Sequence, residues 1–187
     1  QADSHLKDLP TCSFSRMQAD IFDLWLPGAP ELANAACVML SKHLCGAATD
    51  VSLRCAVSAN ATPEGAAVEG FAIATCCHHS CTWEAYVGKD WWLSQGLTPV
   101  DFVRASHFSS WALGAVRHGE GGDTRYGVPP AELRAIGWTA KRVIDAGRLA
   151  YAVSSGFTTA TVVRYCPPEV SPEGFLIMGR RAAHPKK

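Results

Sequence analysis

Short runs of consecutive apolar residues mark the strands that the sequence predicts. Residues 36–40 (ACVML) and 68–75 (VEGFAIAT) are predominantly apolar, as is typical of strands buried on both faces of a sheet. Residues 160–165 are rich in β-branched side chains, which favour strands. A last short strand is predicted at 175–178, and the mixed run at 16–21 is also strand-like.

Apolar residues at helical spacing separate these runs. A helix is predicted near residues 44–55, a long one over 133–151, and a short one with an aromatic face within 83–96. Proline and glycine mark loops at 60–65 and 117–130. In the first helix the apolar positions follow at intervals of four, three and four residues: Leu44, Ala48, Val51 and Cys55.

Strands that alternate with helices predict an α/β sheet, and residues 1–187 are predicted to belong to a single domain. In open α/β sheets, ligands bind outside the carboxyl ends of the strands. The segments 41–46 (SKHLCG) and 75–81 (TCCHHSC) each follow a predicted strand. We therefore expect both to border one crevice.

The amino-acid composition indicates the class of protein and its surroundings but says little about its function. The hydrophobic share of 48% suits a globular domain, and 17 basic residues balance 17 acidic ones. No apolar run has the length of a membrane span and no leader sequence is recognisable, so we expect an intracellular protein, cytoplasmic or nuclear, without a membrane partner. From Lys141 onward the sequence contains eight basic and three acidic residues. This basic end either binds phosphates or is merely solvated.

The segment 76–81 gathers reactive side chains directly after a predicted buried strand. They either bind a metal, line a reactive pocket or are inert core thiols beside surface histidines. Cys76 and Cys81, together with His43 and Cys45, make four zinc ligands on paper. Adjacent residues of a strand point to opposite faces, however, so we expect no metal here and treat eight scattered cysteines as reduced thiols. The reactive residues are Cys76, Cys77, His78, His79 and Cys81.

Lys42 and His43 form a second candidate group at the end of the run 36–40. A lone lysine in a loop is usually only solvated. Beside one histidine and opposite another pair, it becomes a candidate for proton chemistry. Several aromatic residues could stack on bases, but a core position is the favoured interpretation for most of them: Trp83, Tyr86, Trp91, Trp92 and Trp111.

The two loop segments also carry a family resemblance. SKHLCGAATD (41–50) followed by AIATCCHHSCTWEAYVG (72–88) resembles the eukaryotic tRNA 2′-O-methyltransferases that modify the fourth nucleotide of the acceptor stem. AKRVIDAGRLAYAVSSGF (140–157) and VSPEGFLIMG (170–179) are similar to the same family, as is the stretch 16–20.

The resemblance implies a Rossmann-like fold, S-adenosylmethionine (SAM) as the methyl donor and tRNA as the substrate. Asp20 would close the third strand near the adenosine part of SAM. The residues that the resemblance assigns to sites are Lys42, His43 and His78 for catalysis, Asp20, Ser41 and Thr75 for the cofactor, and His79, Arg180 and Arg181 for the substrate.

The glycine-rich turn of such folds is not recognisable. The segment GEGG (119–122) follows no predicted strand, so it is not a nucleotide motif. We therefore expect the chain to be the C-terminal part of a methyltransferase domain, with the first strands missing and zinc possible in a missing N-terminal module. Two alternatives stay open: a zinc-stabilised RNA-binding module without catalysis, and a small-molecule SAM methyltransferase.

Overall fold

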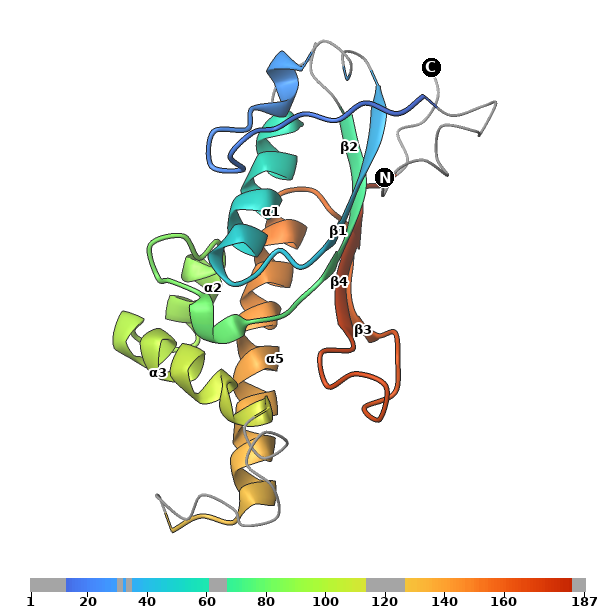
Figure 1. Ribbon diagram of the computed structural model, residues 1–187. Coiled ribbons are helices and arrows are strands. Elements are labelled where there is room, and N and C mark those ends of the chain that lie inside the picture. Colours follow the sequence, from blue (N-terminus) through green and yellow to red (C-terminus); the bar gives the residue numbers. More distant parts are fainter. Residues whose placement is uncertain (1–12, 30–31, 33–34, 61–66, 114–126, 183–187) are drawn as a thin grey trace.

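The computed structural model describes residues 13–29, 32, 35–60, 67–113 and 127–182 (Figure 1). The loops predicted at 60–65 and 117–130 lie largely outside these residues, as do Cys12 and the two C-terminal lysines. Within the described ranges, no helix combines the length and the apolar character that a membrane span needs.

One mixed sheet organises the chain. Its strands are β1 (Ala36–Lys42), β2 (Ala67–Ala74), β3 (Thr159–Arg164) and β4 (Phe175–Arg180), in the spatial order β1-β2-β4-β3. β1 and β2 are parallel, whereas β4 runs antiparallel to both of its neighbours. The four strands predicted from the apolar runs 36–40, 68–75, 160–165 and 175–178 are thus confirmed as neighbours in one sheet.

The helices lie against one face of this sheet (Figure 1). They are α1 (Ala47–Ala59), α2 (Lys89–Ser94), α3 (Pro99–Ser109) and α5 (Pro130–Ser154), with short 3-10 turns η2 (Leu26–Gly28) and η4 (His78–Ser80). α1 and α5 confirm the two predicted helices with clear apolar spacing. The short aromatic helix occupies only part of its predicted range, and α3 has no counterpart in the sequence prediction.

Two strand predictions were wrong. Residues 13–20 have no regular structure, so Asp20 closes no strand; its Oδ1 accepts a hydrogen bond from the Phe22 amide in a turn. β1 is not buried on both faces, because it is an edge strand and the described helices cover only one face of the sheet. Val38 and Leu40 are accordingly 65% and 74% exposed.

Two apolar clusters hold the layers together. The first joins the sheet to α1 and α5 and includes Leu53, Ile73 and Ile177. The second is aromatic: Tyr86 and Trp92 each pack against Phe102 of α3. The core positions expected for Tyr86 and Trp92 are therefore confirmed. Because both rings are buried, neither is accessible for stacking on a base.

Two glycines allow the aromatic cluster to approach α5. A Cβ on Gly88 would lie 2.5 Å from the Gly147 carbonyl carbon, and one on Gly147 would lie 1.9 Å from the Tyr86 hydroxyl oxygen. That hydroxyl donates a hydrogen bond to the Ile144 carbonyl oxygen over 2.9 Å. Close packing here thus depends on two residues without side chains.

Gly147→Ala should destabilise the protein although it introduces a better helix former. Helix propensity alone predicts a gain of roughly 1 kcal/mol, but the new methyl group overlaps Tyr86 and should reverse the sign, with a net loss of about 1–3 kcal/mol. Urea unfolding measures the difference. Thr139→Ala, at an exposed position of the same helix, serves as the control, and a stabilised Gly147→Ala would contradict the packing described above.

Candidate functional site

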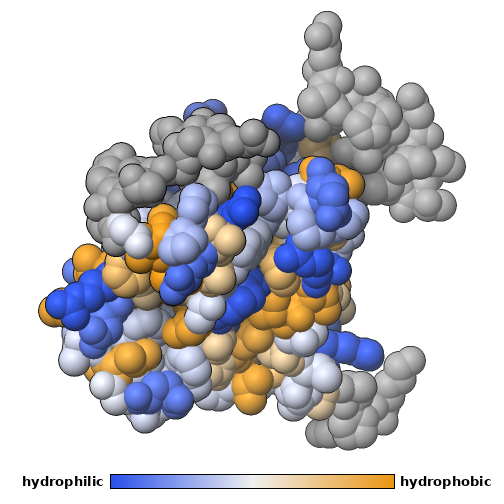
Figure 2. Space-filling model, turned by 90° about the horizontal axis from the view of Figure 1, so that it is seen from below, coloured by the Kyte–Doolittle hydropathy of each residue, from blue (hydrophilic) through white to orange (hydrophobic). Residues whose placement is uncertain are grey.

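The loops after β1 and β2 begin at the same edge of the sheet. Lys42, the last residue of β1, is paired with Ala74, the last residue of β2. This pairing confirms that the segments 41–46 and 75–81 border one region. Figure 2 views the molecule from below, the side toward which these strand ends point in Figure 1, and shows hydrophilic and hydrophobic residues interspersed over that face.

Both loops contain a non-glycine residue with left-handed backbone. His43 has a φ of 66° and Cys77 a φ of 37°, a region that most side chains avoid at a cost of about 1–2 kcal/mol. The loops also touch, because a Cβ on Gly46 would lie 2.4 Å from the Ser80 carbonyl oxygen. Strained backbone is thus concentrated where the two loops meet.

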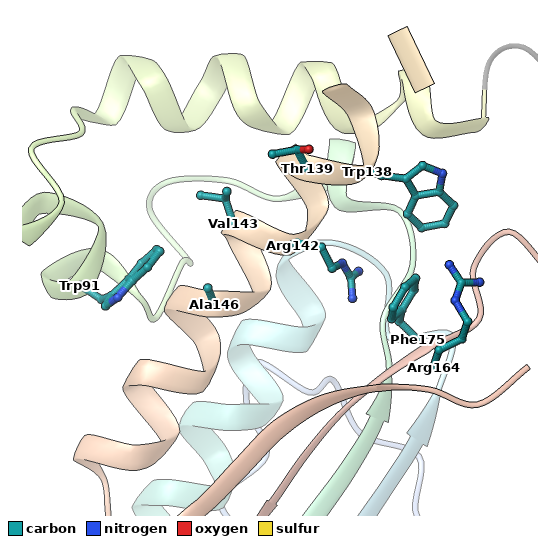
Figure 3. Close-up of a pocket in the computed structure, with 8 residues that line it drawn as sticks. All are labelled: Trp91, Trp138, Thr139, Arg142, Val143, Ala146, Arg164 and Phe175. Carbon is teal, nitrogen blue, oxygen red and sulfur yellow. The ribbon is translucent and has the colours of Figure 1, made fainter. Parts of the chain in front are cut away.

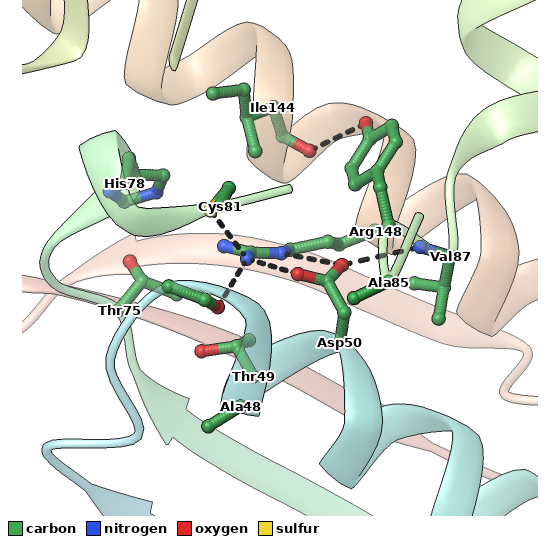
Figure 4. A network of polar contacts seen from close by, with 12 residues as sticks. Ala48, Thr49, Asp50, Thr75, His78, Cys81, Ala85, Val87, Ile144 and Arg148 are labelled. Carbon is green, nitrogen blue, oxygen red and sulfur yellow. Dashed lines mark hydrogen bonds and ion pairs between the residues drawn. The ribbon is translucent and has the colours of Figure 1, made fainter. Parts of the chain in front are cut away.

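A buried arginine fixes the base of this region. Arg148 of α5 is fully buried and contacts Asp50 of α1 at 2.6 Å and Asp145 of its own helix at 3.1 Å. Its guanidinium also donates to the Gly46 carbonyl oxygen at 3.0 Å and lies 3.1 Å from the Cys81 sulfur (Figure 4). One side chain therefore holds α1, α5 and both loops.

Asp145 extends this network toward the loop after β2. It accepts a hydrogen bond from His78 at 2.9 Å and a weaker one from the Thr75 hydroxyl at 3.3 Å, and it pairs with Arg142 at 2.9 Å. Burial by itself would raise the pKa of Asp145. The His78 contact and the two guanidiniums outweigh burial and hold that pKa well below its usual range. Asp145 is therefore a carboxylate that can only accept hydrogen bonds.

Because Asp145 is ionised, it determines which ring nitrogen of His78 carries the hydrogen. The His78 side chain is fully buried, and burial lowers its pKa despite the neighbouring Asp145. Because Asp145 can only accept, the Nε2 atom of the neutral imidazole carries the hydrogen. Nδ1 is left as an acceptor, and no partner for it is present among the described residues.

Other predicted residues of the two loops are exposed, unlike this buried dyad. Lys42 and His43 are both exposed, as is His79, which lines a pocket of about 520 Å³ with Trp83 and His107. His78 is instead shielded from solvent. The structure thus separates the predicted catalytic set into two exposed side chains and one buried histidine.

The predicted cofactor residues are not alike. The Ser41 hydroxyl oxygen is buried and has no hydrogen-bond partner within the described part of the chain. The Thr75 hydroxyl is already bound to Asp145, and Asp20 is exposed in its turn. Of these three residues, Ser41 is the one whose buried polar atom is unused within the described part of the chain.

The two arginines predicted to bind substrate lie at the other end of the sheet. Arg180 pairs with Gly70 near the start of β2, and the Arg181 amide donates to the Glu69 carbonyl oxygen. Because β4 is antiparallel to β2, its first residue, Phe175, lies at the loop end instead. The structure does not bring Arg180 and Arg181 together with Lys42 and His43.

A basic and aromatic pocket of about 420 Å³ lies beside the loop end of the sheet, next to Phe175 (Figure 3). The Arg142 and Arg164 guanidinium carbons lie 3.9 and 4.2 Å from the centre of the Phe175 ring. Trp138 and Trp91 also line the pocket. Sequence reasoning missed it, because these residues are far apart in the chain and carry no shared motif.

The thiols that approach one another differ from the zinc-ligand set considered from the sequence, which was His43, Cys45, Cys76 and Cys81. The sulfurs of Cys45, Cys76 and Cys77 all lie within 4.8 Å of one another. Cys81 is instead buried against Arg148, and burial raises its pKa to about 11. Cys45, expected in apolar surroundings, is exposed.

Sequence reasoning also missed the charged core residues Asp50, Asp145 and Arg148. A signal exists, since Arg142, Asp145 and Arg148 follow at intervals of three and so share one helix face. Such a pattern usually marks a solvated ion-pair row. Only the fold shows that the row faces inward.

Known protein families and relatives that match the sequence agree with the family resemblance of the loop motifs. The family model described as methyltransferase TRM13 matches residues 1–180. The tRNA:m(4)X modification enzyme TRM13 homolog of Mus musculus is 31% identical over 241 aligned positions, covering 92% of this chain and 50% of that protein. Its Homo sapiens counterpart is 30% identical, covering 88% and 48%, and the enzyme of Saccharomyces cerevisiae is 30% identical, covering 95% and 44%.

The chain spans about half the length of the curated relatives it matches. No solved structure matches it.

Arg148→Met should destabilise the protein by about 3–5 kcal/mol, because Asp50 and Asp145 would remain buried without their shared cation. Urea unfolding measures the loss. Arg134→Met, which removes an exposed arginine of the same helix, should change stability by no more than about 0.5 kcal/mol. Equal effects of the two substitutions would show that the buried network is not a major contributor to stability.

Proposed function

Because the chain belongs to the TRM13 methyltransferase family, we propose that it forms the C-terminal part of a methyltransferase domain that acts on tRNA. The family model covers nearly the whole chain, and the relatives are named as tRNA modification enzymes. The single observation that carries a catalytic role is the meeting of two loops at one sheet edge. They expose Lys42 and His43 at the end of β1, and the loop after β2 carries His78, which is buried against Asp145.

The finer proposal is methyl transfer to a ribose 2′-hydroxyl of the acceptor stem. SAM, when bound, supplies a methyl group already activated by the sulfonium charge. The protein must then position the hydroxyl and handle its proton. The exposed side chains at the loop edge suit this task, since a ribose in a duplex remains accessible while the bases are hidden.

The residues present fit only part of a SAM site. The Ser41 hydroxyl, near the end of β1, has no partner among the residues that the structure describes, and open α/β sheets bind their ligands at this edge. Thr75 is occupied by Asp145, and Asp20 belongs to no strand. We therefore assign Ser41 a contact with the cofactor and leave the rest of the site to chain outside these 187 residues.

Lys42 is the proposed catalytic residue. As an amine, lysine can accept the hydroxyl proton, and as an ammonium it can stabilise the forming alkoxide. His43, its exposed neighbour, would orient the ribose or its phosphate. His78 is a positioning residue, because its hydrogen bond to Asp145 fixes the loop after β2 while its ring has no solvent contact.

A zinc-stabilised RNA-binding module without catalysis is the second candidate. The convergence of three thiols favours it, and so does the pocket lined by Arg142 and Arg164, whose guanidiniums suit phosphate. A methyl-transfer assay on tRNA with the full-length enzyme separates the two, since only the first requires turnover.

We expect the 187-residue chain to bind SAM weakly or not at all, whereas the full-length protein binds it. The reason is the absence of a recognisable glycine-rich turn from this sequence. Calorimetric titration of both proteins with SAM tests the point. Tight binding by the short chain would mean that its own residues complete the site.

In the full-length enzyme, Lys42→Ala should lower the methylation rate by roughly 10²–10⁴-fold, the usual contribution of a proton-transfer group. Folding and tRNA affinity should change little, because Lys42 is an exposed residue at the end of β1. Single-turnover kinetics and a binding titration measure the two effects. Lys42→Arg is the matched control: it keeps the positive charge but cannot accept the proton.

Activity retained in Lys42→Arg would assign the lysine to alkoxide stabilisation, and activity lost would assign it to proton acceptance. If Lys42→Ala turns over normally while His43→Ala or His78→Ala is inactive and still folded, the base is a histidine and the assignment of Lys42 is wrong.

A further inference from the structure

Three cysteines from two distant segments converge at the loop edge. Cys45 follows β1, whereas Cys76 and Cys77 follow β2. Their sulfurs lie within 4.8 Å of one another, and those of Cys45 and Cys76 are 3.2 Å apart. Cys45 is exposed and the other two are half-buried, so a small cation can reach all three.

The convergence has a local cause. β2 ends at Ala74, so the alternation of faces expected for adjacent strand residues does not continue to the thiols. Cys77 then adopts left-handed backbone with a φ of 37°. This turn allows neighbouring side chains to lie on the same side, and the pairing of Lys42 with Ala74 brings Cys45 to them.

We propose that Cys45, Cys76 and Cys77 bind one zinc-class divalent cation through three thiolates, with a fourth position left for water or another small ligand. Zinc–sulfur bonds of about 2.3 Å place two tetrahedral ligands about 3.8 Å apart. The Cys45 and Cys76 sulfurs are 3.2 Å apart and no pair is separated by more than 4.8 Å, which is close to this value. Small side-chain rotations therefore suffice to complete the geometry.

Without a metal, the half-buried thiols of the cluster are held in their protonated form. Burial, together with the neighbouring thiols, raises the pKa of Cys76, and burial also raises that of Cys77. Three adjacent thiolates would repel one another, and a divalent charge removes that penalty. Binding would convert three S–H groups into thiolates and release three protons, so affinity should rise with pH.

The site would tie the loop of Lys42 and His43 to the loop of His78. Its existence does not depend on methyl transfer, so it can be tested on a protein that has no activity. The principal rival is a disulfide between Cys45 and Cys76, which would form only in the presence of an oxidant.

The test is a titration of the fully reduced 187-residue chain with Co²⁺ under anaerobic conditions, followed by displacement with Zn²⁺. We expect one Co²⁺ per chain, a thiolate-to-cobalt charge-transfer band and its loss on adding one equivalent of Zn²⁺. Substoichiometric binding, or a cobalt spectrum without thiolate bands, would overturn the proposal.

Serine variants identify the ligands. Cys45→Ser, Cys76→Ser and Cys77→Ser should each weaken binding by about 100-fold or more, at least the usual effect of losing an outer-shell partner. Cys37→Ser, a half-buried cysteine outside the cluster, should bind like the wild type. Unchanged affinity in Cys45→Ser would refute the proposed ligand set.

A footprint on the wild-type protein keeps the test decisive if a variant does not fold. Zn²⁺ should protect Cys45, Cys76 and Cys77 from alkylation while leaving Cys37 unaffected, as mass spectrometry of the peptides would show. No protection by Zn²⁺, combined with a Cys45–Cys76 disulfide after mild oxidation, would replace the metal site by a redox pair.

Discussion

The buried charge of Arg148 is the constraint on which the rest of the structure depends. A fully buried guanidinium requires both opposite charge and hydrogen-bond acceptors. Asp50, Asp145 and the Gly46 carbonyl oxygen supply them from two helices and one loop. If any of these groups moved, the buried guanidinium would lose one of its acceptors. The positions of α1 and α5 are thereby coupled to the loop after β1, and Cys81 extends the coupling to the loop after β2.

This arrangement divides the loop edge into a fixed layer and an exposed layer. His78 belongs to the fixed layer, because it donates to Asp145 and is closed off from solvent. Lys42 and His43 lie in the exposed layer, where a substrate can reach them. The proposed methyl-transfer site would need accurate placement of one hydroxyl, and loops held by a buried, paired network suit that need. The strained backbone at His43 and Cys77 is tolerated because the layer below holds both loops.

The sequence predicted elements whose signal is local. β1, β2 and α5 follow from apolar runs and helical spacing, and the two loops share an edge because the strands are parallel. Three features depend on tertiary packing instead. Asp20 was assigned to a strand, but its segment pairs with no strand among the described residues. The outer face of β1 is exposed, and Arg148 is buried although its helix pattern usually marks a solvated surface. Local patterns do not report which face of a helix meets another layer.

The antiparallel strand β4 decides which basic residues can serve the loop edge. It carries Arg180 toward the opposite end of the sheet and leaves Phe175 at the loop end. Arg164, paired with Phe175, and Arg142 of α5 therefore provide the positive charge beside the loops, stacked on that ring. The five arginines of the basic C-terminal region are thus divided by topology into a buried arginine that stabilises the fold, a distant pair, and two guanidiniums beside a pocket. Net charge along the sequence cannot make this distinction, because the direction of one strand sets it.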